Sequence, residues 1–219
     1  KLGADIFLNE EVLNENRELN DGSYKGWKPI GYVNSIAFQG TFDGQGHTIS
    51  GLYSVVEDID NEDIDLCGLF GYVGDEDEEP AIIKNVSIID SYIKGGTKDY
   101  VSGLCAGGQN VSISKCYFDG AITAQDPLMV GAIFVSRYEN NQIIESCYNQ
   151  SNINVSITKI FDALWGTPII NISGIGGTNT THTVYKCYNT GDITVAINNV
   201  DQSLGMISID GIGSGGRIA

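Results

Sequence analysis

Short apolar runs separated by polar or glycine-containing turns recur along the whole chain. In many of them apolar and polar residues alternate, as in the hexapeptide Ile83-Lys84-Asn85-Val86-Ser87-Ile88. This period of two is that of a β-strand whose side chains face alternately inward and outward. The pattern therefore predicts many short strands joined by turns.

One of these patterns, called segment A, returns five times. Its copies begin at His47, Ile83, Ile113, Ile144 and Val184. A second, glycine-flanked pattern, called segment B, alternates with it without exception. Copies of segment B begin at Gly68, Ser102, Val130, Ser173 and, more weakly, Leu204. Such self-similarity predicts a repeat architecture, because one repeat cannot bury its apolar face alone and a stack of repeats can.

Five residues of segment A are taken as equivalent, at spacings of 34, 30, 31 and 40 residues. They are Leu52, Val86, Cys116, Cys147 and Cys187. Parallel pairing of successive repeats predicts an all-β fold, a right-handed parallel β-helix (β-solenoid) of about five irregular rungs. We expect a single domain over residues 1–219, with an N-terminal capping region at 1–46 and repeats at 47–219. We interpret it as a piece of a longer surface protein.

The aligned cysteines are expected to form an inward column, since a buried free cysteine behaves as a small hydrophobe. A disulfide or metal site between rungs is the alternative. The five cysteines are odd in number and no Cys-x-x-Cys pair occurs, which argues against a disulfide framework and a zinc site. The tyrosine after each cysteine (Tyr117, Tyr148, Tyr188) faces the other way. This outer column serves either cross-rung packing or sugar binding.

Composition supports the strand prediction. Ile and Val together outnumber Leu and Ala about two to one, and there are 28 glycines. Branched residues favour strands over helices. The net charge of −16 argues against nucleic-acid binding, which needs a basic face. No apolar run is long enough for a transmembrane helix, so no membrane insertion is expected.

Two stretches near the N-terminus form a specific motif. Residues 27–31 read Trp-Lys-Pro-Ile-Gly, and residues 38–52 read Phe-Gln-Gly-Thr-Phe-Asp-Gly-Gln-Gly-His-Thr-Ile-Ser-Gly-Leu. Together with Gly68-Leu69-Phe70-Gly71 and the Cys-Tyr-Asn-Thr-Gly of residues 187–191, the chain resembles bacterial GLUG-motif repeat surface proteins. The resemblance covers nearly the whole chain. It departs at Ala132-Ile133-Phe134 and in extra residues around Trp165.

That resemblance implies an extracellular, secreted or surface-attached protein with an adhesin-like, non-catalytic role. The ligand would be a protein or a glycan of unknown identity, and we expect a monomer without cofactors. A carbohydrate-active enzyme fragment, such as a polysaccharide lyase or hydrolase, and a purely structural stalk are the alternatives.

Four regularly placed acids are the candidates for glycosidase chemistry, which needs two carboxylates across the sugar. They are Asp43, Asp90, Asp119 and Asp192. Asp119 and Asp192 lie near the same rung phase, but their Asp-Gly and Gly-Asp neighbours favour turns. Asp43 and His47 are four residues apart, and a tight turn is favoured over a catalytic dyad. No catalytic, cofactor-binding or metal-binding residue is assigned.

Acidic residues concentrate between positions 57 and 79, which hold 11 of the 28 acids. Calcium takes oxygen ligands of this kind. However, the spacing fits no known calcium motif, and solvated, mutually repelling loops are the default interpretation.

Overall fold

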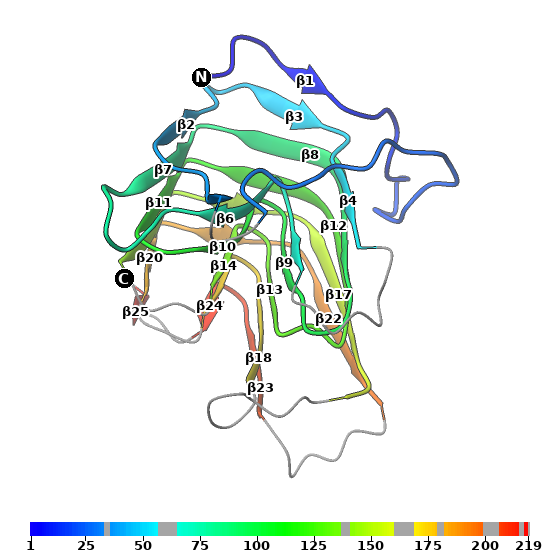
Figure 1. Cartoon of the computed structure of the whole chain (residues 1–219). Helices are drawn as coiled ribbons and strands as arrows, with labels where there is room; N and C mark the ends of the chain where they lie inside the picture. Colours follow the sequence, from blue (N-terminus) through cyan, green and yellow to red (C-terminus); the bar gives the residue numbers. More distant parts are fainter. Residues whose placement is uncertain are drawn as a thin grey trace.

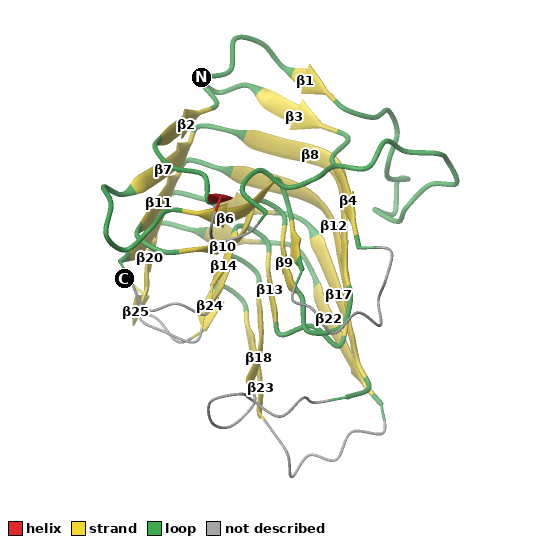
Figure 2. Ribbon diagram, in the orientation of Figure 1, coloured by secondary structure: helices red, strands yellow, loops and turns green. Residues whose placement is uncertain are grey.

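A computed structural model describes residues 1–32, 36–56, 65–136, 141–159, 169–178, 182–198, 206–214 and 217–218. Their strands form four sheets, and every strand pair within these sheets is parallel (Figures 1 and 2). This confirms the all-β, parallel-sheet prediction. In the described part of the chain, no helix has the length and apolar character needed to cross a membrane.

The largest sheet, sheet 1, has nine strands. They are β1 (Ile6–Phe7), β3 (Thr48–Ser50), β4 (Tyr53–Val55), β8 (Ser87–Gly95), β12 (Tyr117–Gln125), β16 (Tyr148–Asn149), β17 (Asn152–Ile157), β21 (Tyr188–Asn189) and β22 (Ile193–Ile197). Sheet 2 has six: β2 (Thr41–Asp43), β7 (Ala81–Lys84), β11 (Val111–Ser114), β15 (Gln142–Glu145), β20 (His182–Tyr185) and β25 (Arg217–Ile218).

The other two sheets have five strands each. Sheet 3 contains β5 (Leu66–Cys67), β9 (Tyr100–Ser102), β13 (Met129–Gly131), β18 (Ile169–Ser173) and β23 (Met206–Asp210). Sheet 4 contains β6 (Phe70–Val73), β10 (Cys105–Gly108), β14 (Phe134–Ser136), β19 (Gly176–Thr178) and β24 (Gly213–Ser214).

The chain visits these sheets in a fixed order, from sheet 4 to sheet 2, sheet 1 and sheet 3, and back to sheet 4. We call one such passage a coil. Each coil pairs with the preceding one, so β8 is followed in its sheet by β12, and β10 by β14. Segment A spans the corner from sheet 2 to sheet 1, and segment B spans sheets 3 and 4. The predicted alternation of the two segments is thus the path of the chain around the stack.

The core lies inside the four sheets and consists of columns of equivalent residues. In sheet 2, Ile83, Ile113, Ile144 and Val184 pair in register and are all buried. Burial of one such side chain contributes on the order of 1.5–3 kcal/mol. The next inward position along the chain holds Val86, Cys116, Cys147 and Cys187, which are buried as well. The predicted inward column is confirmed for these four residues.

Leu52, however, does not belong to that column. Thr48 pairs with Ser87, so the residue equivalent to Val86 is His47, whose carbonyl accepts a hydrogen bond from Ser87 N. Leu52 is buried directly before β4 and lies opposite Ser91. The misassignment arises because Ile49 and Leu52 have the same spacing as Ile83 and Val86, although Ile49 pairs with Ile88.

The last copy of segment B was also misplaced. Gly176 pairs with Gly213, and Ser173 pairs with Asp210. The copy therefore begins at Asp210, as Asp210-Gly211-Ile212-Gly213, and not at Leu204. The branched residues of β23 resemble segment B in composition, but they occupy the preceding strand position.

The described residues before β2, 1–32 and 36–40, lie at one end of the stack (Figure 1). Strand β1 pairs with β3, and Ile30 and Phe38 form parallel bridges to Phe70 and Val73. The indole Nε1 of Trp27 donates to the carbonyl of Leu69 at 3.1 Å. These contacts cover strand edges that would otherwise be open, which is the role expected of a cap.

Glycine in segment B allows coils to approach closely. A Cβ atom on Gly103 would lie 2.5 Å from the ring of Phe118 and 2.6 Å from the carbonyl oxygen of Ala132. At the corner of segment A, by contrast, the chain turns without glycine in four copies. The residues that have positive φ there are of other types. Asn85, Lys115, Ser146 and Lys186 all have φ between 53° and 56°.

We predict that Gly103→Ala lowers the free energy of unfolding by about 1–3 kcal/mol, because the methyl group overpacks the interior. Gly26→Ala is the matched control, since a Cβ there meets nothing within 4 Å. Its effect should stay within about 0.5 kcal/mol. Urea unfolding measures both, and equal losses in the two variants would contradict the close approach.

Candidate functional site

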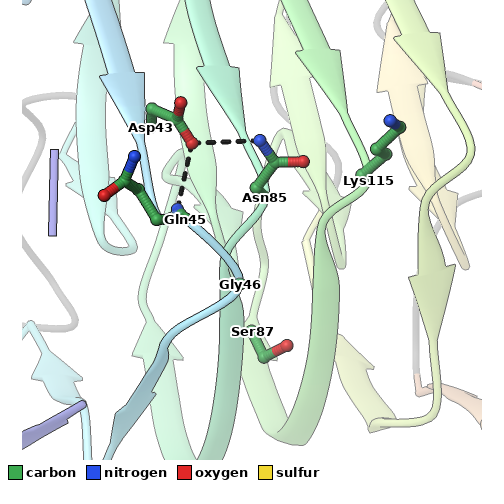
Figure 3. A pocket seen from close by; sticks show the side chains of 6 residues that line it. All are labelled: Asp43, Gln45, Gly46, Asn85, Ser87 and Lys115. Carbon is green, nitrogen blue, oxygen red and sulfur yellow. Dashed lines mark hydrogen bonds between the residues drawn. The ribbon is translucent and has the colours of Figure 1, made fainter. Parts of the chain in front are cut away.

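A hollow of about 470 Å³ lies at the corner where sheet 2 meets sheet 1. Asp43, Gln45, Gly46, Asn85, Ser87 and Lys115 line it (Figure 3). The Oδ1 atom of Asp43 accepts hydrogen bonds from Asn85 Nδ2 and from the Gln45 amide, each at 3.0 Å. These bonds, that of Asn85 first, lower the pKa of Asp43, and the nearby Lys84 adds to the effect. The hollow therefore contains a carboxylate that is ionised at neutral pH.

The segment after Asp43 is a tight turn, as predicted. Gln45 and Gly46 both have positive φ, and His47 N donates to the carbonyl of Gly44 at 2.9 Å. The His47 ring does not form a dyad with Asp43, because its Nδ1 lies 3.2 Å from the Oδ1 of Asp5. The same oxygen accepts from Thr48 N.

Tyrosines form a column on the outer side of sheet 1. The rings of Tyr117 and Tyr148 are stacked, with centroids 5.2 Å apart and an interplanar angle of 14°. Tyr188 follows in register and is 66% exposed. The hydroxyl of Tyr117 donates to Asp119 Oδ2 at 3.1 Å, and burial, followed by the charge of Asp119, raises the pKa of Tyr117 to about 12. Cross-coil packing is thus confirmed for the first pair.

Asp90 and Asp119 hold the N-terminal region against sheet 1. The ladder between β8 and β12 shifts register at this point, so Asp90 is an extra residue with φ of 47°. Its carboxylate accepts from the amides of Val12 and Leu13. Asp119 forms an ion pair with Arg17 at 3.0 Å. Both acids therefore have structural partners in the loop that precedes the repeats.

Asp119 and Asp192, which were expected near the same rung phase, lie in different columns. Phe118 pairs with Asn149, so Asp119 lies in the column of Gln150. Ile153 pairs with Ile193, which places Asp192 opposite Asn152. The two acids are thus two positions apart along the strands, and the Asp192 side chain is exposed.

The acidic segment is described only in part. Glu57, Asp58, Asp60, Glu62 and Asp63 lie outside the described residues, as does Trp165. In the part that is described, Asp75 accepts from Asp77 N in a turn. No group of three or more metal-ligating side chains occurs among the residues that the structure describes.

A buried carboxylate that the sequence did not reveal lies before β9. Asp99 is only 2% exposed and accepts hydrogen bonds from the amides of Gly96 and Asp65. Burial, with a contribution from the charge of Asp65, raises its pKa to about 6. The available signal was its position directly before the apolar run Tyr100-Val101.

All five cysteines are free and buried. The amide of Cys147 faces the Sγ of Cys187 at 3.4 Å, which is a packing contact within the inward column. Burial raises the pKa of the Cys105 thiol to about 12. The hydrophobic interpretation of the cysteines therefore holds over a disulfide.

No model of a known protein family matches the chain. A stretch of 129 residues, 58% of the chain, is 33% identical to Halomucin of Haloquadratum walsbyi. The match spans about 1% of the length of that protein. Among solved structures, a protein described as a "putative immunoglobulin A1 protease" from Bacteroides ovatus is similar over 99% of this chain and 69% of its own. The TM-score is 0.55 at 14% identity, which is a likeness of fold.

The buried thiols should resist modification. At pH 8 we expect native protein to react with a disulfide reagent at least about a hundredfold more slowly than unfolded protein, because reaction requires opening of the coil. Thr190→Cys is the reference variant, since position 190 is exposed. Its added thiol should react rapidly, whereas rapid reaction of the wild-type thiols would contradict their burial.

Asp99 predicts a pH-dependent stability. Its folded pKa of about 6 lies above the ordinary value of 3.8, so its contribution is fully present below pH 4 and is lost as pH rises through 6. The ionised form costs up to about 3 kcal/mol at pH 7. Asp99→Asn should therefore gain stability relative to wild type between pH 4 and pH 7, as urea unfolding would measure.

Asp77→Asn, an exposed turn residue, is the control for this comparison. The change of its difference from wild type with pH is the reference. If the Asp99→Asn difference changes no more than this between pH 4 and pH 7, the Asp99 carboxyl group is not the cause.

Proposed function

We propose that the chain is a non-enzymatic extracellular module of a bacterial surface protein, adhesin-like, which binds a glycan or protein ligand on its outer face. The fold would be a right-handed parallel β-helix of about five rungs. The resemblance to GLUG-motif surface proteins supports this proposal. The residues of the motif also make contacts that stabilise the first coil. Trp27, Ile30 and Phe38 cover β6, and residues 44–47 form the turn before β3.

The observation that carries the proposal is that three of the four candidate acids have structural partners. Asp90 binds backbone amides, Asp119 pairs with Arg17, and Asp43 is held by Asn85. A general acid must exchange a proton with substrate, whereas these carboxylates are engaged in organising turns and the N-terminal loop. Such an arrangement favours binding over catalysis.

The outer side of sheet 1 provides a surface for binding. Polar side chains lie beside the tyrosine column. One of them is Thr190, whose hydroxyl oxygen lies 2.7 Å from the hydroxyl oxygen of Tyr148. Rings with polar tips are common at recognition surfaces because they combine apolar area with hydrogen bonding. The likeness to Halomucin and to the Bacteroides ovatus structure is compatible with an extracellular setting.

We predict specific binding without turnover. The immobilised protein should bind members of a glycan array or of a panel of secreted host proteins in the micromolar range, by surface plasmon resonance. Incubation with a broad polysaccharide panel should release no reducing ends and no unsaturated products. New ends that disappear in Asp119→Asn or Asp43→Asn would establish an enzyme instead. Absence of any binding would favour a structural stalk.

A further inference from the structure

We propose that the hollow beside Asp43 and Asn85 binds one uncharged pyranose ring of an oligosaccharide, stacked on Tyr117 over Ser87. This inference rests on the proposed binding function and names its ligand class and subsite.

The tyrosine column has a gap beside Tyr117. In register, the column reads Thr48, Ser87, Tyr117, Tyr148 and Tyr188. Tyr117 stacks on Tyr148 on one side, whereas the position on its other side holds the small Ser87. Equivalent residues in neighbouring parallel strands lie about 4.8 Å apart. A flat ring bound over Ser87 would therefore stack on Tyr117 at the spacing between neighbouring coils.

This gap adjoins the hollow, because Ser87 is one of the residues that line the hollow (Figure 3). The volume of about 470 Å³ exceeds what a single sugar ring needs, so the ring and part of its neighbour fit. Sugar rings present apolar C–H faces to aromatic side chains and hydroxyl groups at their edges, which is the combination that this place requires.

Polar groups lie around the gap. Asn85 uses its Nδ2 for Asp43, and its carbonyl oxygen points toward the side of Lys115 (Figure 3). Asp43 binds Asn85 and Gln45 through Oδ1, while Oδ2 lies 3.9 Å from Lys84. Carboxylate and amide oxygens accept from sugar hydroxyls, and the exposed Lys115 donates to them.

Charge selects an uncharged sugar. The protein carries −16 overall, which repels an acidic polysaccharide before contact. At the hollow, the ammonium group of Lys84 already lies beside the carboxylate of Asp43. Arg17 is paired with Asp119. Lys115 alone adds a positive charge to the lining, which is opposed by Asp43.

The experiment uses protein with ¹³C-labelled tyrosine rings and a panel of neutral tetrasaccharides (cellotetraose, mannotetraose, chitotetraose, maltotetraose). The Tyr117 signal, assigned with Tyr117→Phe, should shift with at least one sugar. Ser87→Tyr fills the gap and should weaken binding about tenfold or more. Should that variant misfold by circular dichroism, Tyr117→Leu, which removes the ring face, is expected to give the same loss.

Tyr32→Ser is the control, because it removes an exposed ring that lies beside Gly71 of sheet 4, outside the tyrosine column. It should leave both the affinity and the Tyr117 shift unchanged. Tetragalacturonate tests the charge argument and should bind more weakly than the best neutral sugar.

Three results would overturn the proposal: no Tyr117 shift with any neutral sugar at 10 mM, unchanged affinity in Ser87→Tyr and Tyr117→Leu, or preference for tetragalacturonate. The proposed function fails separately, if neither the glycan array nor the protein panel yields a ligand. A ligand whose binding is unaffected by these variants leaves the function in place and rejects the subsite.

Discussion

The structure depends on the parallel backbone ladder between successive coils. Each coil hydrogen-bonds to the one before it, and this ladder places every residue directly beside its counterpart one coil away, about 4.8 Å along the stack. Inward columns such as Ile83, Ile113 and Ile144 are a direct consequence. So is the outer tyrosine column, since neighbouring positions in a strand face opposite ways. Core and surface are therefore organised by the same constraint.

The ladder tolerates irregularity only where a side chain or a turn compensates for it. Asp90 is inserted as a bulge, and its carboxylate then binds the amides of Val12 and Leu13. At the corner of segment A, Asn85 and Lys115 take up positive φ so that the chain can turn from sheet 2 to sheet 1. The acids that looked available for chemistry are thus largely the residues that make the irregularities stable.

The alternating pattern was sufficient to predict the sheets and most of the columns. Val86 and the three cysteines align because segment A keeps a constant number of residues between strands in those coils. The prediction was wrong at Leu52, because Ile49 and Leu52 repeat the spacing of Ile83 and Val86 although Ile49 pairs with Ile88, and at the last copy of segment B. It placed Asp119 and Asp192 only near the same phase, since a displacement of two residues keeps a side chain on the same face. Periodicity of two cannot detect such a shift.

By itself, the sequence determined an all-β repeat with inward branched residues, inward cysteines and an outer row of tyrosines, because these follow from local alternation and repetition. Only the tertiary structure decided which residues far apart in the sequence become neighbours. It brought Asp5 to His47, Arg17 to Asp119, and the amide of Asp65 to the buried Asp99. It also placed Ser87 beside Tyr117 at the edge of a polar hollow. Such neighbours are separated by 30 or more residues in the sequence, and their distance depends on loop lengths that no local pattern encodes.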